Sequence, residues 1–257
     1  MVRPPLDRPR PHRRPAVRHR RRGPGVTKVI RGRTPARRVR SEPRRPPIDS
    51  QDWDARYRAT EQLWGVEPNR WVVRECEGLP PGRALDLAAG EGRNSIWLAE
   101  RGWHATAVDF SVVAVDRGRT LAATRPPGTA DRIDWVHADV LTPAPGPAGY
   151  DLVLVAYLQL PAAERRTALR WAAAALAPGG TLLVVGHDSL NLTGGTGGPQ
   201  DPRVLFTPAD VLDDLAGLGL ETVRAERVRR TVAAPDGHGT AGEAIDALVR
   251  LHRPEPR

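Results

Sequence analysis

The chain has 257 residues, enough for one large α/β domain and a short appendage. It carries 39 Lys and Arg against 30 Asp and Glu, and its single cysteine excludes an internal disulfide. It has neither a run of about 18 apolar residues nor a Cys/His cluster with metal-ligand spacing, so we expect a cytoplasmic protein that uses no metal and spans no membrane.

Residues 1–48 form a basic, proline-rich tail. It holds 17 of the Lys and Arg but only two acids, Asp7 and Glu42, which makes its net charge +15 and that of the remaining chain −6. The tail has no apolar periodicity and its like charges repel, so we expect it to be disordered. Three explanations stay open: an extension without function, an arm that binds nucleic acid by counterion release, and a targeting peptide, which its prolines oppose.

Residues 49–257 have the pattern of a folded α/β domain that begins with a helical cap over residues 49–80. In this cap, interleaved apolar and charged residues predict short helices at 52–57 and 69–76. Strands and helices then alternate, as in a doubly wound sheet. The predicted strands are residues 84–87, 105–108, 133–136, 152–156 and 181–185, and the predicted helices are residues 94–101, 112–123, 162–176 and 208–218.

The C-terminal end departs from this alternation. Two strands are expected at residues 221–232 and 244–252, with a turn at 235–239 between them. The sequence thus predicts five βα units and a closing β-hairpin. In such sheets ligands bind at the carboxyl ends of the parallel strands.

The turn after the first predicted strand, residues 86–92, is rich in small residues: Asp-Leu-Ala-Ala-Gly-Glu-Gly. Small side chains permit a sharp turn and close approach of a ligand, and the helix that follows offers unpaired N–H groups. Read as Gly90-x-Gly92-x-x-Ser95, the stretch approximates a dinucleotide fingerprint without its third glycine. Asp86 favours another ligand, because a carboxylate there repels a pyrophosphate but bonds the ammonium of an amino acid.

Two later strands also end in a carboxylate. Asp109 can accept both ribose hydroxyls of an adenosine, as it would in an NAD-binding protein. Asp139 can receive the adenine amino group. Because parallel strands end at one edge of a sheet, we expect Asp86, Asp109 and Asp139 to lie along one rim.

The sequence resembles class I S-adenosylmethionine-dependent methyltransferases, and residues 85–95 resemble the tellurite-resistance-type small-molecule branch. The likeness runs from about Trp53 to the C-terminus and includes residues 150–157 and 176–182. It implies a doubly wound, seven-stranded, mostly parallel α/β sheet of order 3-2-1-4-5-7-6, with an antiparallel last strand and helices on both faces. The cofactor-binding residues that it implies are Asp86, Ala88, Gly90, Gly92, Asn94, Asp109, Phe110, Asp139, Val140, Ala156 and Trp64.

Ala88 departs from the family's pattern, which has glycine at this position. Its methyl group is expected to crowd the methionine part of the cofactor. Replacement of Ala88 by glycine should then tighten cofactor binding.

Candidates for contact with the methyl acceptor follow the fourth and fifth strands. His187 is a candidate base, with a purely structural histidine as the alternative, and Tyr157 and Gln159 are further candidates. The glycine-rich segment 193–202 is either a lid or a surface loop.

Aromatic residues of the cap, Trp53, Tyr57 and Trp64, are interpreted either as a wall that suits a cation or as a cover for the core. Cys76 is expected to serve packing.

Methyl transfer from a sulfonium needs an aligned nucleophile and exclusion of water, and no acid or base is obligatory. The sequence favours displacement onto a small molecule, because no Asn-Pro-Pro-Tyr segment of the kind found in many nucleic-acid methyltransferases follows the fourth strand. Alternatives are a nucleic-acid or protein methyltransferase that uses the tail, a nicotinamide-dependent oxidoreductase, and a binding module without activity. The sequence leaves open the oligomeric state and whether the acceptor atom is S, N, O or a metalloid.

Overall fold

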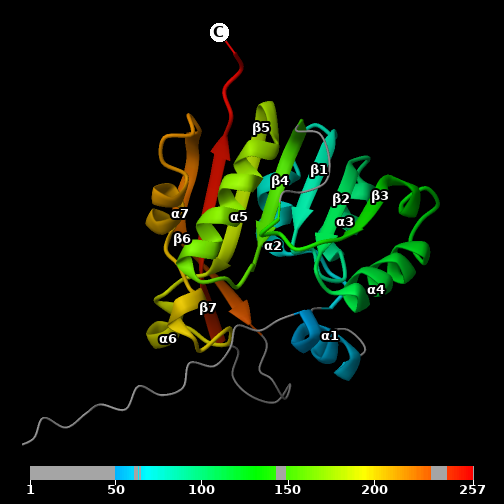
Figure 1. Ribbon diagram of the computed structural model, residues 1–257, viewed down its shortest axis with the longest axis horizontal. Coiled ribbons are helices and arrows are strands. Elements are labelled where there is room, and N and C mark those ends of the chain that lie inside the picture. The colour runs from blue at the N-terminus through cyan, green and yellow to red at the C-terminus, as the bar shows by residue number, and fades with distance from the viewer. Residues whose placement is uncertain (1–49, 61–62, 64, 143–148, 233–241, 257) are drawn as a thin grey trace, which may run out of the picture. The chain divides into compact units, whose positions relative to one another are not determined.

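A computed structural model describes residues 50–60, 63, 65–142, 149–232 and 242–256, all within the unit Pro47–Arg257. Its centre is a seven-stranded sheet of order β3-β2-β1-β4-β5-β7-β6 (Figure 1). Only β7 runs antiparallel to its neighbours, β5 and β6. The predicted sheet order is therefore confirmed. The strands are β1 (Arg83–Leu87), β2 (His104–Asp109), β3 (Ile133–His137), β4 (Tyr150–Ala156), β5 (Leu176–His187), β6 (Glu221–Val232) and β7 (Gly242–His252).

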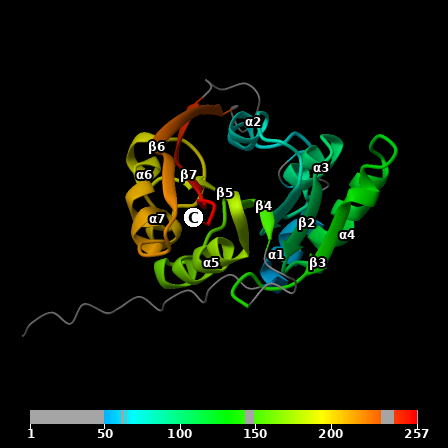
Figure 2. The ribbon, with the colours of Figure 1, turned by 90° about the horizontal axis from the view of Figure 1, so that it is seen from above.

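Helices cover both faces of the sheet, as expected (Figure 2). They are α1 (Ser50–Ala59), α2 (Arg70–Cys76), α3 (Arg93–Glu100), α4 (Val112–Ala123), α5 (Ala162–Ala175), α6 (Asn191–Gly194) and α7 (Pro208–Asp214), with single 3₁₀ turns at Ala130–Arg132 and Pro202–Val204. On one face, Leu169 of α5 and Val211 of α7 pack in one core cluster with Leu85 and Val153. On the other, Trp71 of α2 and Trp97 of α3 pack with Leu154.

Central strands read as continuous apolar runs because both of their faces are buried. Residues 152–155 of β4 are all buried, for example. The edge strand β6 is mostly exposed and rich in arginine, a composition that discourages pairing with another chain.

Three predicted details are wrong. The predicted count of five βα units is one too many, because no helix was predicted after residues 133–136 and none follows β3 in the described residues. Helix α7 ends at Asp214 rather than at residue 218. The residues that follow include Gly217 and Gly219, whose positive φ angles are incompatible with a helix. β5 starts at Leu176 rather than at 181, and an irregularity in its pairing with β4 lies between the pairs Tyr150–Leu176 and Leu152–Thr181. The hairpin turn expected at 235–239 lies outside the described residues.

The two cap helices are found where the sequence predicts helices, and polar contacts fix them to the domain. Asn69 caps α2 by accepting a hydrogen bond from the Trp71 amide, 2.9 Å long. The Asn69 amide itself donates to Oδ1 of Asn94, at the start of α3, over 2.9 Å. Helix α1 packs against α4, where Ser111 Oγ donates to Asp54 Oδ1. The cap therefore lies at the carboxyl ends of β1 and β2.

Candidate functional site

Asp86, at the end of β1, is buried on the face that α2 and α3 cover, because side chains alternate along a strand and its neighbours Leu85 and Leu87 pack on the other face. Ser95 Oγ donates to its Oδ2 over 2.8 Å. Its Oδ1 is buried and has no hydrogen-bond partner in the described part of the chain. Burial, helped by the negative charge of Asp109, raises the pKa of Asp86 to about 7. A buried carboxylate oxygen without a partner is costly, so this position suits a cationic ligand.

Arg93, the first residue of α3, lies within electrostatic range of Asp86 and was not among the predicted site residues. Burial lowers the pKa of Arg93, while the charges of Tyr157 and Asp86 oppose that shift. A cation in the first turn of a helix is opposed by the helix dipole. This unfavourable placement was the one signal in the sequence that pointed to a role for Arg93. Together, Asp86 and Arg93 offer the two charges that an amino-acid zwitterion requires.

The turn between Asp86 and Arg93 uses the left-handed backbone region three times. Ala88 has a φ of 57°, Gly90 of 58° and Gly92 of 74°. Ala88 is therefore strained where glycine would not be, at a cost of about 1–2 kcal/mol. Gly92 is required for a second reason: a Cβ there would come within 2.2 Å of the Trp135 ring.

Asp109, at the end of β2, connects the first two loops of the rim. Its Oδ2 accepts from the Gly90 amide over 2.8 Å and its Oδ1 from the Ser111 amide over 2.9 Å. Burial raises its pKa. Each carboxylate oxygen can still accept a second hydrogen bond, so these contacts leave room for ribose hydroxyls. The half-buried Phe110 follows, with its carbonyl oxygen 3.0 Å from Nε2 of His137.

Asp139 and Val140 lie after β3, at the same rim. Asp139 is exposed, and its Oδ1 accepts from the Leu141 amide over 2.9 Å. One oxygen thus stabilises the local turn, and the side chain can still accept from a ligand. Asn94, by contrast, already holds the cap through its Oδ1.

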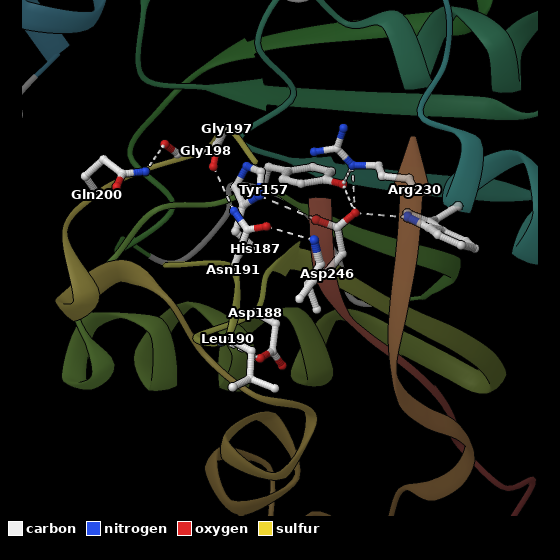
Figure 3. Close-up of polar contacts among 12 residues, drawn as sticks. Tyr157, His187, Asp188, Leu190, Asn191, Gly197, Gly198, Gln200, Arg230 and Asp246 are labelled. Atoms are coloured by element: carbon white, nitrogen blue, oxygen red, sulfur yellow. Dashed lines mark hydrogen bonds and ion pairs between the residues drawn. The ribbon is translucent and has the colours of Figure 1, made fainter. Parts of the chain in front are cut away.

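A second cluster of polar side chains surrounds Asp246 of β7, which is fully buried (Figure 3). Its Oδ2 accepts from Tyr157 Oη over 2.7 Å, Arg230 Nε over 2.8 Å and Trp71 Nε1 over 3.1 Å. Nδ1 of His187 lies 3.5 Å from Oδ1 of Asp246. The sequence analysis predicted His187 and Tyr157 but missed Asp246 and Arg230.

Tyr157 directly follows β4 with a φ of 58°, a strained value for a residue other than glycine. Its amide donates to the Val185 carbonyl over 2.7 Å, and its ring meets His187 edge-on at 4.9 Å between centroids. Backbone strain of this kind costs about 1–3 kcal/mol and persists only where surrounding contacts maintain it. Burial, with Asp246 beside it, raises the pKa of Tyr157. Ala156 precedes Tyr157 and is half-buried against the apolar core cluster that contains Trp71 and Trp97.

The segment after α1 lies against the glycine-rich turn. The Leu63 amide donates to Glu91 Oε2 over 3.1 Å, and Arg117 connects Glu91 with the Thr60 carbonyl. The predicted aromatic wall is only partly available to a ligand, because the Arg56 guanidinium already stacks on Trp53 at 4.9 Å. Tyr57 is buried. Trp64, expected at the cofactor, lies outside the described residues.

Cys76 faces the core, and burial raises its pKa to about 12, so its thiol stays protonated. Packing is the role that suits it. Within the described ranges, no group of three or more His, Cys, Asp or Glu side chains is placed to hold a metal ion. No helix among them has the length and apolar character needed to cross a bilayer.

Residues 84–180 match the family described as a methyltransferase domain. Demethylmenaquinone methyltransferase of Clavibacter sepedonicus is 33% identical over 124 residues, which are 48% of this chain and 47% of that protein. The tRNA 5-carboxymethoxyuridine methyltransferase of Escherichia coli is 30% identical over 113 residues, 43% of this chain and 42% of that protein. The chain thus spans about half the length of the curated relatives it matches.

Solved structures share the fold. The glycopeptide N-methyltransferase MtfA, complexed with S-adenosylmethionine, has a TM-score of 0.55 and 21% identity, over 74% of this chain and 96% of that one. TehB from Haemophilus influenzae has a TM-score of 0.59 and 16% identity, over 79% and 67%. At these identities the likeness shows the fold alone.

The matched segment, the sheet order and the turn after β1 define a class I S-adenosylmethionine-dependent methyltransferase domain. The matched segment, residues 84–180, belongs to this class, whose cofactor is S-adenosylmethionine, and TehB is among the structural neighbours of the chain. The class, the sheet and the cofactor are those expected from the sequence, and they displace the nicotinamide alternative.

Proposed function

We propose that this chain transfers the methyl group of S-adenosylmethionine to a small molecule by direct displacement at the methyl carbon. The observation that carries the proposal is the unsatisfied oxygen of Asp86 beside the guanidinium of Arg93, at a turn whose backbone a ligand can approach closely. A carboxylate and a guanidinium in these positions suit the methionine end of the cofactor. Asp86 would bind its ammonium group and Arg93 its carboxylate. When bound, the cofactor supplies an electrophilic methyl group.

The remaining cofactor contacts follow the rim of the sheet. Asp109 would accept the ribose hydroxyls, while Asp139 would take the adenine amino group. Phe110 and Val140, next to these acids, would contact the adenine ring. Ala88, Gly90, Gly92 and Ala156 would line the cofactor with backbone and small side chains. Asn94 would act at a distance, by holding the cap.

A small acceptor agrees with the way the cap lies on the site. Ser111 bonds Asp54 of α1, while Glu91 and Asn94 bond Leu63 and Asn69 in the segment between α1 and α2, so three contacts hold the cap against the loops after β1 and β2. Such a cover excludes water from the reacting atoms, which methyl transfer requires. It also limits the size of an acceptor that can enter.

Binding of S-adenosylhomocysteine, measured by isothermal titration calorimetry, tests the proposal directly. We expect saturable binding, and transfer of a labelled methyl group to some member of a panel of phenols, amines and thiols. No binding at millimolar concentration would refute the cofactor assignment. Binding of S-adenosylhomocysteine without methyl transfer to any acceptor would contradict the proposed activity and indicate a module that only binds the cofactor.

A nucleic-acid acceptor is the second candidate, and the charge of +15 in residues 1–48 favours it. An arm of this charge would bind RNA by counterion release, with an affinity that falls steeply with salt. Deletion of residues 1–48 should then abolish RNA binding and leave S-adenosylhomocysteine binding unchanged. Equal RNA affinity with and without these residues would contradict this candidate.

A further inference from the structure

His187 and Asp246 occupy facing positions of neighbouring strands, since the register of β5 and β7 pairs them directly. Both side chains lie on the sheet face that α2 and α3 cover, the face of Asp86: along β5, Leu183 and Val185 pack there, and along β7, Leu248 does. Strands in a sheet are about 4.8 Å apart, and β4 alone separates β1 from β5, so the two strands are about 10 Å apart across the sheet. The register places Leu87 level with Val184, so His187 lies three residues beyond the end of β1. The pair is therefore at the same edge of the sheet as the glycine-rich turn.

Asp246 accepts three hydrogen bonds, and Figure 3 shows Tyr157 and Arg230 on two sides of its carboxylate. Trp71, Tyr157 and Arg230 all donate to Oδ2. Oδ1 is buried without a hydrogen bond in the described part of the chain, and so is Nδ1 of His187, 3.5 Å away. Two buried polar atoms that face each other without bonding are unusual and require an explanation.

A small approach of the two groups would complete a carboxylate–imidazole pair. An N–H···O bond is normally 2.7–3.2 Å long, so a movement of about 0.5 Å suffices, and catalytic hydrogen bonds are often long before a substrate binds. Such a bond places the imidazole proton on Nδ1 and leaves the lone pair of Nε2 to accept a proton. The His187 side chain is 11% exposed and that of Asp246 is not exposed at all, so an acceptor can reach only the imidazole.

We propose that His187, oriented by Asp246, accepts the proton of a hydroxyl group on the methyl acceptor, which makes the chain an O-methyltransferase for a phenol or an alcohol. This inference rests on the proposed methyl transfer and specifies its acceptor. His187 is the catalytic residue of the proposal. Asp246 and Tyr157 are positioning residues.

The charges around His187 favour a hydroxyl over other acceptors. The titratable groups that face it in the described residues are Asp246 from β7, Arg230 from β6 and Tyr157 from β4. The guanidinium of Arg230 repels an ammonium group, whereas it stabilises the negative charge that develops on an oxygen nucleophile. A thiol ionises near neutral pH without a base, so the pair would add little for it.

His187 is in the protonation state that a base needs. Burial lowers its pKa, Asp246 acts to raise it, and Arg230 acts to lower it, with the net shift downward. The imidazole is therefore neutral at pH 7.

The proposed step balances as follows. The acceptor O–H bond breaks and its proton moves to Nε2 of His187. The oxygen forms a bond to the methyl carbon, and the S–CH₃ bond breaks with its electron pair on sulfur, which gives a methyl ether and S-adenosylhomocysteine. The imidazolium then releases its proton to water.

The loop around Gly198 shields the imidazole of His187 from water. A Cβ at this position would come within 2.8 Å of Cε1 of His187, so the loop backbone lies directly on the ring. Asn191 fixes this loop, because its Nδ2 donates to the Gly197 carbonyl over 2.7 Å and its Oδ1 accepts from the Ile245 amide. The loop therefore already covers one side of the imidazole and shields it from water.

The first experiment follows the imidazole itself. The titration of His187 is measured by NMR in the full-length protein with S-adenosylhomocysteine bound, and the signal is assigned through His187→Gln. Because Asp246 favours the charged imidazole, Asp246→Asn should move the midpoint to lower pH and change the Nδ1 proton signal. An unchanged midpoint overturns the pairing.

The second experiment compares two acceptors of one class at pH 8. Phenol is almost entirely protonated there, while 4-nitrophenol is mostly an anion. His187→Asn and His187→Gln should each lower kcat for phenol by about 100-fold or more and change that for 4-nitrophenolate by less than about threefold. The exposed His104, at the opposite end of the sheet, provides the matched control His104→Asn.

Equal losses for the two phenols would reveal a structural histidine and overturn the proposal. A wild-type protein that binds S-adenosylhomocysteine but methylates only amines or thiols would overturn the acceptor class and leave methyl transfer standing. Loss of S-adenosylhomocysteine binding in the wild type would be a failure of the proposed function itself, so the two failures are distinguishable.

Discussion

The Ser95 hydroxyl bonds only one oxygen of Asp86, at 2.8 Å from Oδ2, and the other oxygen is buried without a partner in the described residues. One hydrogen bond does not compensate the burial of a charge. The folded chain thus favours the protonated acid unless a cation binds it. This explains why the pKa is raised to about 7 even though the Ser95 bond acts to lower it.

Folding stability should depend on the ionisation of Asp86. Its pKa is about 7 in the folded chain and near the ordinary 3.8 when unfolded. Between these values the folded state binds the extra proton, so the unfolding free energy falls as pH rises from about 4 to 7. Asp86→Asn removes the charge. Urea unfolding should show it equal to wild type at pH 5 and about 1–3 kcal/mol more stable at pH 8, and equal stability at pH 8 would contradict the argument.

Cofactor affinity should show the opposite trend with pH. An ionised Asp86 attracts the ammonium of S-adenosylhomocysteine, so affinity should rise as pH increases through about 7. Calorimetric titrations at pH 6 and 8 measure this. In Asp86→Asn the affinity should be low at both values. A wild-type affinity independent of pH would place the ammonium elsewhere.

Ala88→Gly should stabilise the domain, because glycine adopts a φ of 57° without strain. The gain of about 1–2 kcal/mol in the folded state is partly offset by the greater freedom of glycine when unfolded. We expect a net increase of about 0.5–1 kcal/mol in the unfolding free energy, measured with urea. The expected crowding of the cofactor by the methyl group adds a second effect, tighter binding of S-adenosylhomocysteine.

Ala89→Gly is the matched control, since Ala89 is the next residue and has no positive φ. Glycine there brings only its unfolded-state entropy and should lower the unfolding free energy by about 0.5–1 kcal/mol. If both variants shifted stability in the same direction, strain at Ala88 would not be the cause.

The placement of three carboxylates along one rim of the sheet could be predicted from the sequence because these residues follow strands of local pattern. Asp86, Asp109 and Asp139 each end an apolar run, and a parallel sheet brings such ends to one edge whatever the details of packing. Arg93 was missed because a charged residue beside a glycine turn is usually a solvated residue at the start of a helix. Its unfavourable position in the helix dipole was a weak signal, and its partial burial, a tertiary property, is not visible in the sequence.

The residues proposed to act on the methyl acceptor could be predicted only in part. His187 was visible as a polar residue at a strand end. Its partner Asp246 is 59 positions later, and the pairing depends on the register of the antiparallel β5 and β7, which no local pattern specifies. Likewise, the positive φ angles of Ala88 and Tyr157 result from tertiary contacts that oppose local preference.

Gly118→Ala should destabilise the chain, although alanine normally favours a helix by about 1 kcal/mol. A Cβ at this position of α4 would come within 2.3 Å of the Trp135 ring and 3.1 Å of the Glu91 carbonyl. We expect a loss of about 1–3 kcal/mol from overpacking, measured by urea unfolding. In a Trp135→Leu background the same change should cost at least about 1 kcal/mol less. Equal costs in both backgrounds would exclude the ring as the obstacle.

Arg93→Gln should weaken binding of the amino-acid end of the cofactor and leave binding of its nucleoside end unchanged. S-adenosylhomocysteine carries an amino-acid group, whereas 5′-methylthioadenosine has the same nucleoside without it. If Arg93 holds the carboxylate, its loss should weaken S-adenosylhomocysteine about 10- to 100-fold, the effect of one charge-assisted hydrogen bond of about 1.5–3 kcal/mol, and leave 5′-methylthioadenosine unchanged. Calorimetry with both ligands measures the difference.

Two variants give this comparison its controls. Asp109→Asn should weaken both ligands by the same factor, because both contain the ribose that Asp109 would bind. Arg101→Gln, just past the opposite end of the same helix, should weaken neither. Should Arg93→Gln reduce the two affinities equally, the residue would act on the turn between Asp86 and α3 rather than on the carboxylate, and the zwitterion assignment would rest on Asp86 alone.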